Sequence, residues 1–174
     1  MLAVDLVGLR LASPVLNASG TFCPETFARM MPLAEVLGAL VTKTVTPHAQ
    51  PGNDQQRTVE LPGVGMLNSI GLQGKGLAHL LDHDIPAWAS HGLPIVLGVS
   101  AASPELFAQM ARDALAHPSA GPHIGLIELN LSCPNVKAGG SSFGSSPHWV
   151  GEVARAVREV LPDGRVPLFA KLTP

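Results

Sequence analysis

The stretch IGLIELN at residues 124–130 joins a short apolar run, residues 124–129, to a polar residue, Asn130. The run is short and lacks strict alternation of apolar and polar residues, which is typical of a strand buried on both faces of a parallel sheet. Four other runs share this character, each short, bounded by Gly or Pro and mostly without alternation: residues 14–17, 38–42, 94–99 and 167–170. The pattern predicts five buried parallel strands.

Helical patterns lie between these runs. Ser103-Pro104-Glu105 supplies an N-cap, a first-turn proline and an acid, and Ser146-Pro147 repeats this start signal. Apolar residues follow at helical spacing, namely Phe107, Met110, Ala111 and Ala114 in the first helix and Val150, Val153, Ala154, Val157 and Leu161 in the second, which Pro162 and Gly164 end. Weaker helix candidates are residues 24–31 and 74–91, and residues 2–11 alternate around Gly8 like a short hairpin. The order predicts an α/β fold of βα repeats, either a barrel or a doubly wound sheet.

Polar residues at the strand ends decide between the two architectures. Four of them follow predicted strands: Ser19, Lys43, Asn130 and Lys171. In a (β/α)8 TIM barrel such ends converge on one catalytic face, and the absence of GxGxxG after the first strand disfavours a dinucleotide-binding sheet. We therefore predict a TIM barrel. Five strands cannot close a barrel of eight, so either the chain is a fragment or the other three strands come from elsewhere.

Composition excludes several classes of protein. The 174 residues are 46% hydrophobic and 14% charged, with a formal net charge of -2. They show no basic stripe for nucleic acid and no apolar run long enough to span a membrane. The start MLAVDLVGL is a poor signal peptide because it carries Asp5 and no basic region. Two cysteines 110 positions apart do not form a disulfide framework, so we expect a cytoplasmic protein.

The four lysines are Lys43, Lys75, Lys137 and Lys171, and two of them end apolar strands. A charge there is costly to desolvate unless it meets a partner. Lys43 and Lys171 at equivalent places in the repeat indicate an anionic or electron-rich ligand, while a lysine that extends into water from the strand end remains the alternative.

The segment ELNLSCPNVKAGGSSFG at residues 128–144 leaves a buried strand and at once presents polar groups around Cys133. Asn130 and Asn135 on either side of the thiol are too polar for ordinary core and favour a pocket for a planar, amide-bearing molecule. Cys133 could act there as a nucleophile or proton acceptor, although a lone cysteine is more often a small buried hydrophobe. Cys23 lacks such surroundings and is interpreted as structural. A second constellation, residues 65–72 (GMLNSIGL), is either a ligand loop or a surface turn.

Five collinear motifs give the whole chain a resemblance to the dihydroorotate dehydrogenase family. They are Asn17-Ala18-Ser19-Gly20, Val41-Thr42-Lys43-Thr44, residues 66–72 (MLNSIGL), residues 128–135 (ELNLSCPN) and Lys171-Leu172-Thr173-Pro174. The family is an FMN-containing barrel longer than this chain. The resemblance therefore implies that residues 1–174 are the N-terminal portion of a single FMN-binding TIM-barrel domain, with the C-terminal strands absent. The continuation at residues 136–140 (VKAGG) resembles class 1B catalytic subunits, which pair with an iron–sulfur and FAD subunit and pass electrons to NAD.

The resemblance implies roles for particular positions. It implies Cys133 as the catalytic base, and no metal. The positions implied to contact FMN are Ala18, Ser19, Lys43, Thr44, Asn130 and Lys171. The positions implied to bind dihydroorotate or orotate are Lys43, Asn68, Ser69, Ile70, Gly71, Leu72, Asn130 and Asn135. It also implies a homodimer or heterotetramer when complete, without nucleic acid or membrane.

The implied reaction is oxidation of dihydroorotate to orotate in pyrimidine biosynthesis, with Cys133 taking the C5 proton and FMN the C6 hydride. Two departures are Gly98, where related sequences tend to carry an Asn that touches FMN, and residues 21–24 (TFCP), which replace a glycine-rich continuation. The flavin phosphate site is expected outside this sequence. Three alternatives stay open: a non-catalytic half barrel, a flavoenzyme for another dihydropyrimidine, and fumarate instead of NAD as electron acceptor.

Overall fold

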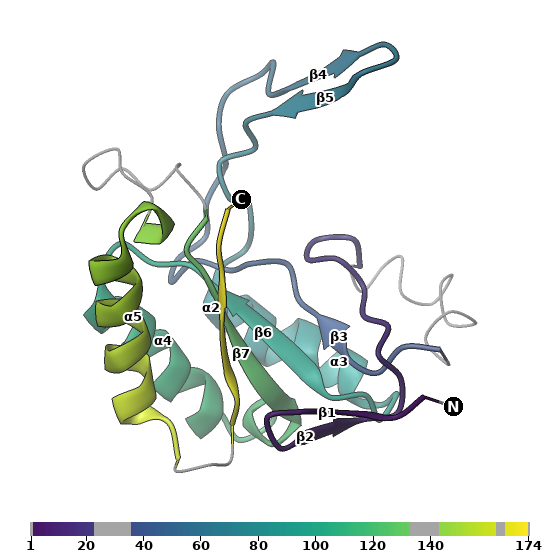
Figure 1. The fold of residues 1–174 in the computed structure, drawn as a ribbon, viewed down its shortest axis with the longest axis vertical. Helices are drawn as coiled ribbons and strands as arrows, with labels where there is room; N and C mark the ends of the chain where they lie inside the picture. Colours follow the sequence, from purple (N-terminus) through teal and green to yellow (C-terminus); the bar gives the residue numbers. More distant parts are fainter. Residues whose placement is uncertain (1, 23–35, 133–142, 163–165, 174) are drawn as a thin grey trace.

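The computed structural model describes residues 2–22, 36–132, 143–162 and 166–173 (Figure 1). A four-stranded parallel sheet forms its centre, in the order β3-β6-β7-β8. The strands are β3 (Leu40–Val41), β6 (Ile95–Val99), β7 (Ile124–Asn130) and β8 (Leu168–Lys171). The prediction of parallel strands is confirmed for four of the five apolar runs.

The expectation of a regular strand at residues 14–17 is wrong. This segment makes a single parallel bridge to the sheet, between Leu16 and Ala39. Pro14 has no N–H to donate, and the next backbone groups of β3 are bound by the side chain of Asn17 instead of by a strand. The segment therefore lies beside β3 without extending the ladder.

Two helices cover one face of the sheet, α4 (Pro104–Ala116) and α5 (Pro147–Val160) (Figure 1). The predicted N-cap of α4 is confirmed, because the backbone N–H of Leu106 donates to Ser103 Oγ at 3.3 Å. Ser146 precedes α5 without a side-chain cap bond. The apolar stripes predicted for both helices face the sheet, with Phe107 of α4 and Val153 and Val157 of α5 fully buried.

The helix candidate at residues 74–91 is confirmed over a shorter range. It comprises α2 (Leu77–His79), a π-helical turn (Leu80–Asp84) and α3 (Ile85–Ala89). Short 3-10 turns occupy Gly121–His123 and Phe143–Ser145. The candidate at residues 24–31 and Cys23 lie outside the described residues. No described helix is long and apolar enough to cross a membrane.

Two antiparallel hairpins complete the described chain. β1 (Val4–Leu6) and β2 (Leu9–Leu11) form the predicted hairpin, whose turn places Gly8 at φ +89°. β4 (Thr58–Leu61) and β5 (Gly65–Asn68) form a second hairpin, which projects away from the sheet (Figure 1). The sequence interpretation missed this second hairpin because its residues are exposed on both faces and leave no burial pattern.

On the face of the sheet opposite the helices, the side chains of β7 change from apolar to polar towards its carboxyl end. Side chains two positions apart share a face, so Leu126, Glu128 and Asn130 of β7 all point to this inner side. Leu126 packs in an apolar cluster with Val96 and with Leu11 of the β1–β2 hairpin. The hairpin thus covers the amino end of the sheet, and polar side chains remain for the carboxyl end.

Candidate functional site

A cavity of about 290 Å³ lies where the central strands end. Its lining residues are Ser19, Lys43, Thr44, Asn68, Ile70, Gly71, Leu72, Asn130 and Lys171. All nine are positions that the sequence singled out, and the fold brings them together from segments more than 150 residues apart. Ala18 and Ser69 lie beside the cavity in sequence without lining it. Cys133 and Asn135 lie outside the described residues.

Asn17 fixes one wall of this cavity. Its Nδ2 donates to the carbonyl oxygens of Val41 at 2.9 Å and Ala18 at 3.0 Å, and its Oδ1 accepts the Val41 N–H at 2.8 Å. The side chain is buried, so these bonds satisfy backbone groups that water does not reach. They hold the segment that carries Ser19 against the end of β3.

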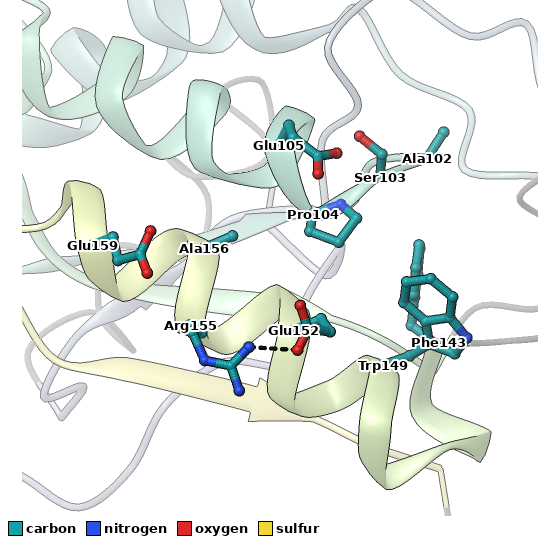
Figure 2. Close-up of a pocket in the computed structure, with 10 residues that line it drawn as sticks. All are labelled: Ala102, Ser103, Pro104, Glu105, Phe143, Trp149, Glu152, Arg155, Ala156 and Glu159. Atoms are coloured by element: carbon teal, nitrogen blue, oxygen red, sulfur yellow. Dashed lines mark hydrogen bonds and ion pairs between the residues drawn. The ribbon is translucent and has the colours of Figure 1, made fainter.

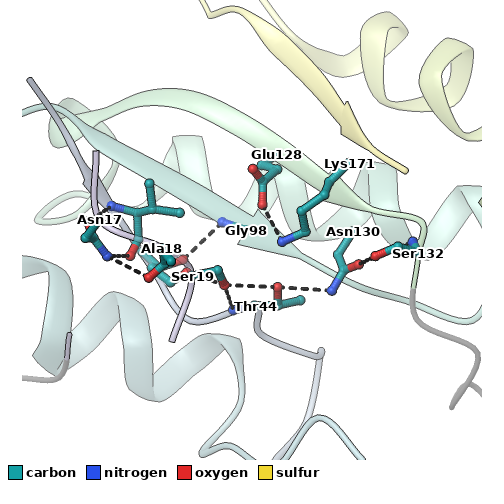
Figure 3. A network of polar contacts seen from close by, with 11 residues as sticks. Asn17, Ala18, Ser19, Thr44, Gly98, Glu128, Asn130, Ser132 and Lys171 are labelled. Carbon is teal, nitrogen blue, oxygen red and sulfur yellow. Dashed lines mark hydrogen bonds and ion pairs between the residues drawn. The ribbon is translucent and has the colours of Figure 1, made fainter. Parts of the chain in front are cut away.

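A chain of hydrogen bonds joins the ends of β3 and β7 across the cavity (Figure 3). Ser19 Oγ donates to the Thr42 carbonyl at 3.0 Å and accepts the Thr44 N–H at 3.2 Å. Asn130 Nδ2 donates to Thr44 Oγ1 at 3.2 Å, while its Oδ1 accepts from Ser132 Oγ at 2.8 Å. These hydrogen bonds fix the orientation of the Asn130 amide, three positions before Cys133 in the sequence.

The two lysines of the site have different surroundings. Lys171 Nζ lies 2.7 Å from Glu128 Oε1, on the inner face of the sheet (Figure 3). Lys43 is exposed, and its side chain passes close to Gly20, where an added Cβ would lie 3.9 Å from Nζ. The ammonium group of Lys43 can therefore reach a ligand in the cavity, whereas that of Lys171 is held by Glu128.

The opposite wall comes from the loop that follows β5. Asn53 Nδ2 donates to the Ser69 carbonyl at 2.9 Å and to Ser69 Oγ at 2.8 Å, and the Asn53 N–H donates to the Ile70 carbonyl at 3.0 Å. Gly71 has φ +75°, and Leu72 has φ +51°, which is uncommon for a residue with a side chain. The loop is thus bent into a defined shape at the point where it lines the cavity.

Gly98 lies in the middle of the sheet, where its N–H donates to Thr42 Oγ1 at 3.0 Å. A Cβ at this position would meet Thr44 atoms at 3.5 Å, which is ordinary van der Waals contact. The structure therefore leaves room for a Cβ at position 98.

A larger cavity of about 590 Å³ lies outside the sheet, between α4 and α5 (Figure 2). Hydrogen bonding with Ser103 lowers the pKa of Glu105, and the Arg155 guanidinium lowers the pKa of Glu152. Glu105 and Glu152 in this cavity thus interact with protein groups. Because active sites of barrels lie at the carboxyl ends of strands, we take the smaller cavity as the functional site.

The arrangement at the strand ends can bind a planar ligand rich in carbonyl oxygens. It offers two ammonium groups, two amides and two hydroxyls around one small cavity, and apolar contacts from Ile70 and Leu72. Four supporting residues were not predicted as part of the site: Asn17, Thr42, Asn53 and Glu128. Three of these, Asn17, Thr42 and Glu128, lie within the motifs quoted above, so membership of a motif was the available signal.

Comparisons with known proteins identify a family and a fold for this chain. The family model described as dihydroorotate dehydrogenase matches residues 1–174. The catalytic subunit of dihydroorotate dehydrogenase B (NAD(+)) from Geobacillus sp. strain WCH70 is 40% identical over 174 residues, as is that from Anoxybacillus flavithermus. The solved structure of the Eimeria tenella enzyme DHODH in complex with ferulenol superimposes with a TM-score of 0.73 at 21% identity.

These matches cover this chain and the relatives unequally. Each bacterial alignment includes 99% of this chain and 53% of the relative, and the Eimeria structure is covered to 52%. The chain therefore spans about half the length of the curated relatives it matches. Its parallel sheet with helices on the outer face corresponds to part of a (β/α)8 barrel.

Proposed function

The chain belongs to the dihydroorotate dehydrogenase family, and from this premise we propose that it carries the FMN- and pyrimidine-binding part of an enzyme that oxidises dihydroorotate to orotate. We propose that residues 1–174 contribute to a single barrel domain. The observation that carries the proposal is the cavity at the strand ends, because every residue that lines it is one for which the family resemblance implies a ligand contact.

The residues present fit FMN. A flavin ring presents carbonyl oxygens and ring nitrogens, and the site offers Ser19 Oγ, the Asn130 amide, Thr44 Oγ1 and the Lys171 ammonium as partners. Bound FMN would supply the hydride acceptor. A cation such as Lys171 would stabilise negative charge on the reduced ring.

The substrate would be held by the loop wall and by Lys43. We propose that the ammonium of Lys43 binds the carboxylate of dihydroorotate, with Asn68, Asn130 and Asn135 hydrogen-bonding its ring amides. This group of contacts would orient the ring and exclude water from one side. The backbone of Ser69, Ile70, Gly71 and Leu72 would contribute the remaining contacts.

Cys133 is the proposed base. It follows Asn130 and Ser132 in the sequence. The Ser132 hydroxyl donates to Asn130 Oδ1 at 2.8 Å, so the residues that precede the cysteine are held in place. The Sγ thiolate would accept the proton from C5 of the substrate. Ala18 and Thr44 complete the proposed flavin contacts.

The bacterial relatives are named as catalytic subunits of an NAD(+) enzyme. We propose, on this basis, that the protein pairs with an iron–sulfur and FAD subunit and transfers electrons through it to NAD. The complete assembly would be a homodimer or heterotetramer.

Substitution of Lys43 tests the proposal. In the full-length gene product, we expect Lys43→Met to weaken orotate binding at least tenfold, since an ion pair to a carboxylate contributes about 1.5–3 kcal/mol. Lys75→Met is the matched control, because Lys75 is also exposed but does not line the cavity. Orotate titration by flavin difference spectroscopy is the measurement.

Cys133→Ala provides a second arm, in which FMN should remain bound while dihydroorotate oxidation is mostly lost. Unchanged orotate affinity in Lys43→Met, or oxidation near the wild-type rate in Cys133→Ala, would contradict the assigned roles. A wild-type protein that binds neither FMN nor orotate would refute the proposed function itself.

A further inference from the structure

Glu128 lies one layer below the candidate cavity. It is on the inner face of β7, two residues before Asn130, and its side chain is 18% exposed. It does not line the cavity, yet its Oε1 lies 2.7 Å from the Nζ of Lys171, which does. An acidic side chain thus contacts the site only through a lysine.

The register of the two strands explains this contact. Asn130 of β7 is paired with Lys171 of β8, and Glu128 is paired with Phe169. Glu128 is therefore the diagonal neighbour of Lys171 on the same face, within reach of a long side chain. The lysine side chain leans back along the sheet, away from the strand end, to reach the carboxylate.

We propose that Glu128 is a positioning residue for Lys171, which holds the ammonium at the floor of the cavity and shares its positive charge. The inference rests on the proposed function, in which Lys171 faces the flavin. An ammonium group that is held in place and partly neutralised by a carboxylate would stabilise the reduced, more negatively charged flavin less than an unpaired lysine would. Glu128 would then shift the midpoint potential of the flavin without contacting it.

A purely structural ion pair is the competing explanation. Lys171 is 34% exposed, and ion pairs with this much exposure contribute little to stability. A carboxylate that also shares the inner face with an apolar cluster is costly to desolvate. Stability alone is thus a weak reason to keep Glu128 under this lysine.

Charge removal in the full-length gene product tests the proposal. Glu128→Gln keeps the size and one acceptor oxygen but removes the charge, and Lys171→Met removes the cation. Glu60→Gln is the matched control, because Glu60 is exposed on β4. The measurement is the FMN midpoint potential, together with the dissociation constants of oxidised and reduced FMN.

We expect Glu128→Gln to favour reduced over oxidised FMN at least threefold more than the wild type does, which is about 14 mV for a two-electron couple. In the Lys171→Met background the same substitution should have no effect. An equal loss of affinity for both forms would indicate a structural role only, and an undiminished effect without Lys171 would show that Glu128 acts directly; either result overturns the proposal.

A second measurement needs no flavin. Pulse acetylation with acetic anhydride, read by mass spectrometry, reports the accessibility of each lysine in the apoprotein. Glu128→Gln should increase labelling of Lys171 at least threefold and leave Lys75 unchanged. If the wild type bound no FMN, the proposed function would fail, and unchanged labelling of Lys171 would separately refute the positioning role.

Discussion

Replacement of Asn17 by Ala should damage both the fold and the site. The Asn17 amide binds the N–H and the carbonyl of Val41 at 2.8 and 2.9 Å, and Val41 is only 7% exposed. Asn17→Ala leaves both backbone groups without these bonds. Each unsatisfied buried group costs about 1–3 kcal/mol, so we expect a loss of about 2–6 kcal/mol, near the lower value if water enters the gap.

The assay is urea denaturation of the full-length gene product, with the change in midpoint read at constant slope. Asn53→Ala is the matched control, because Asn53 has the same amide but is exposed, and we expect it to lose less than about 1 kcal/mol. Equal losses in the two variants would refute the reasoning, since burial of the Asn17 bonds is what separates them. Asn17→Ala should also weaken FMN binding, because the segment that carries Ser19 loses the Asn17 bonds to Val41 of β3.

Three further substitutions test the sheet and its helices. Ser103→Ala removes the N-cap of α4 and should cost about 1 kcal/mol. In this variant the pKa of Glu105, which Ser103 lowers most, should rise towards its ordinary value. A lowered carboxyl pKa stabilises the folded protein at neutral pH and no longer does so in acid. The difference in free energy of unfolding between the wild type and Ser103→Ala should therefore shrink from pH 7 to pH 3. A stability difference that increased in acid would contradict this expectation. Gly98→Ala should change stability by less than about 1 kcal/mol, because its Cβ meets only ordinary contacts. Gly38→Ala should be strongly destabilising, because its Cβ would overlap the Ser13 carbonyl oxygen. Thermal unfolding of the two glycine variants is the measurement, and a large loss of stability in Gly98→Ala would show that this space is not available.

The sequence was a good guide to the fold where burial is complete. The strand at residues 124–130 is buried on both faces, so its apolar run and its end could be predicted from composition. The sequence was a poor guide where the backbone is not held by hydrogen bonds between strands. Residues 14–17 resemble a strand in composition, but an asparagine side chain replaces the backbone bonds there. The exposed β4–β5 hairpin has no buried face and so left no periodic signal.

Prediction of the site divides along the same line. Lys43, Asn130 and Lys171 could be found because polar residues that end apolar strands are unusual, and parallel strands bring their ends together. The supporting residues could not be found in this way. Asn17 binds Val41 24 positions away, and Glu128 binds Lys171 43 positions away. Such partners depend on strand register, which the pattern of apolar residues does not determine across a parallel sheet.

The two walls of the cavity differ in what supports them. The wall built on β3 and β7 is tied to the core by buried bonds, such as Asn130 to Thr44. The wall at Ser69–Leu72 is held by exposed contacts with Asn53 and belongs to a projecting loop. Exposed contacts contribute little to global stability, and loops of this kind open with less free energy than core strands. Substitutions in the first wall should therefore alter folding and ligand affinity together, whereas substitutions in the loop wall should alter ligand affinity alone. This separation allows ligand discrimination to vary in the loop without loss of the sheet that positions Lys43 and Lys171.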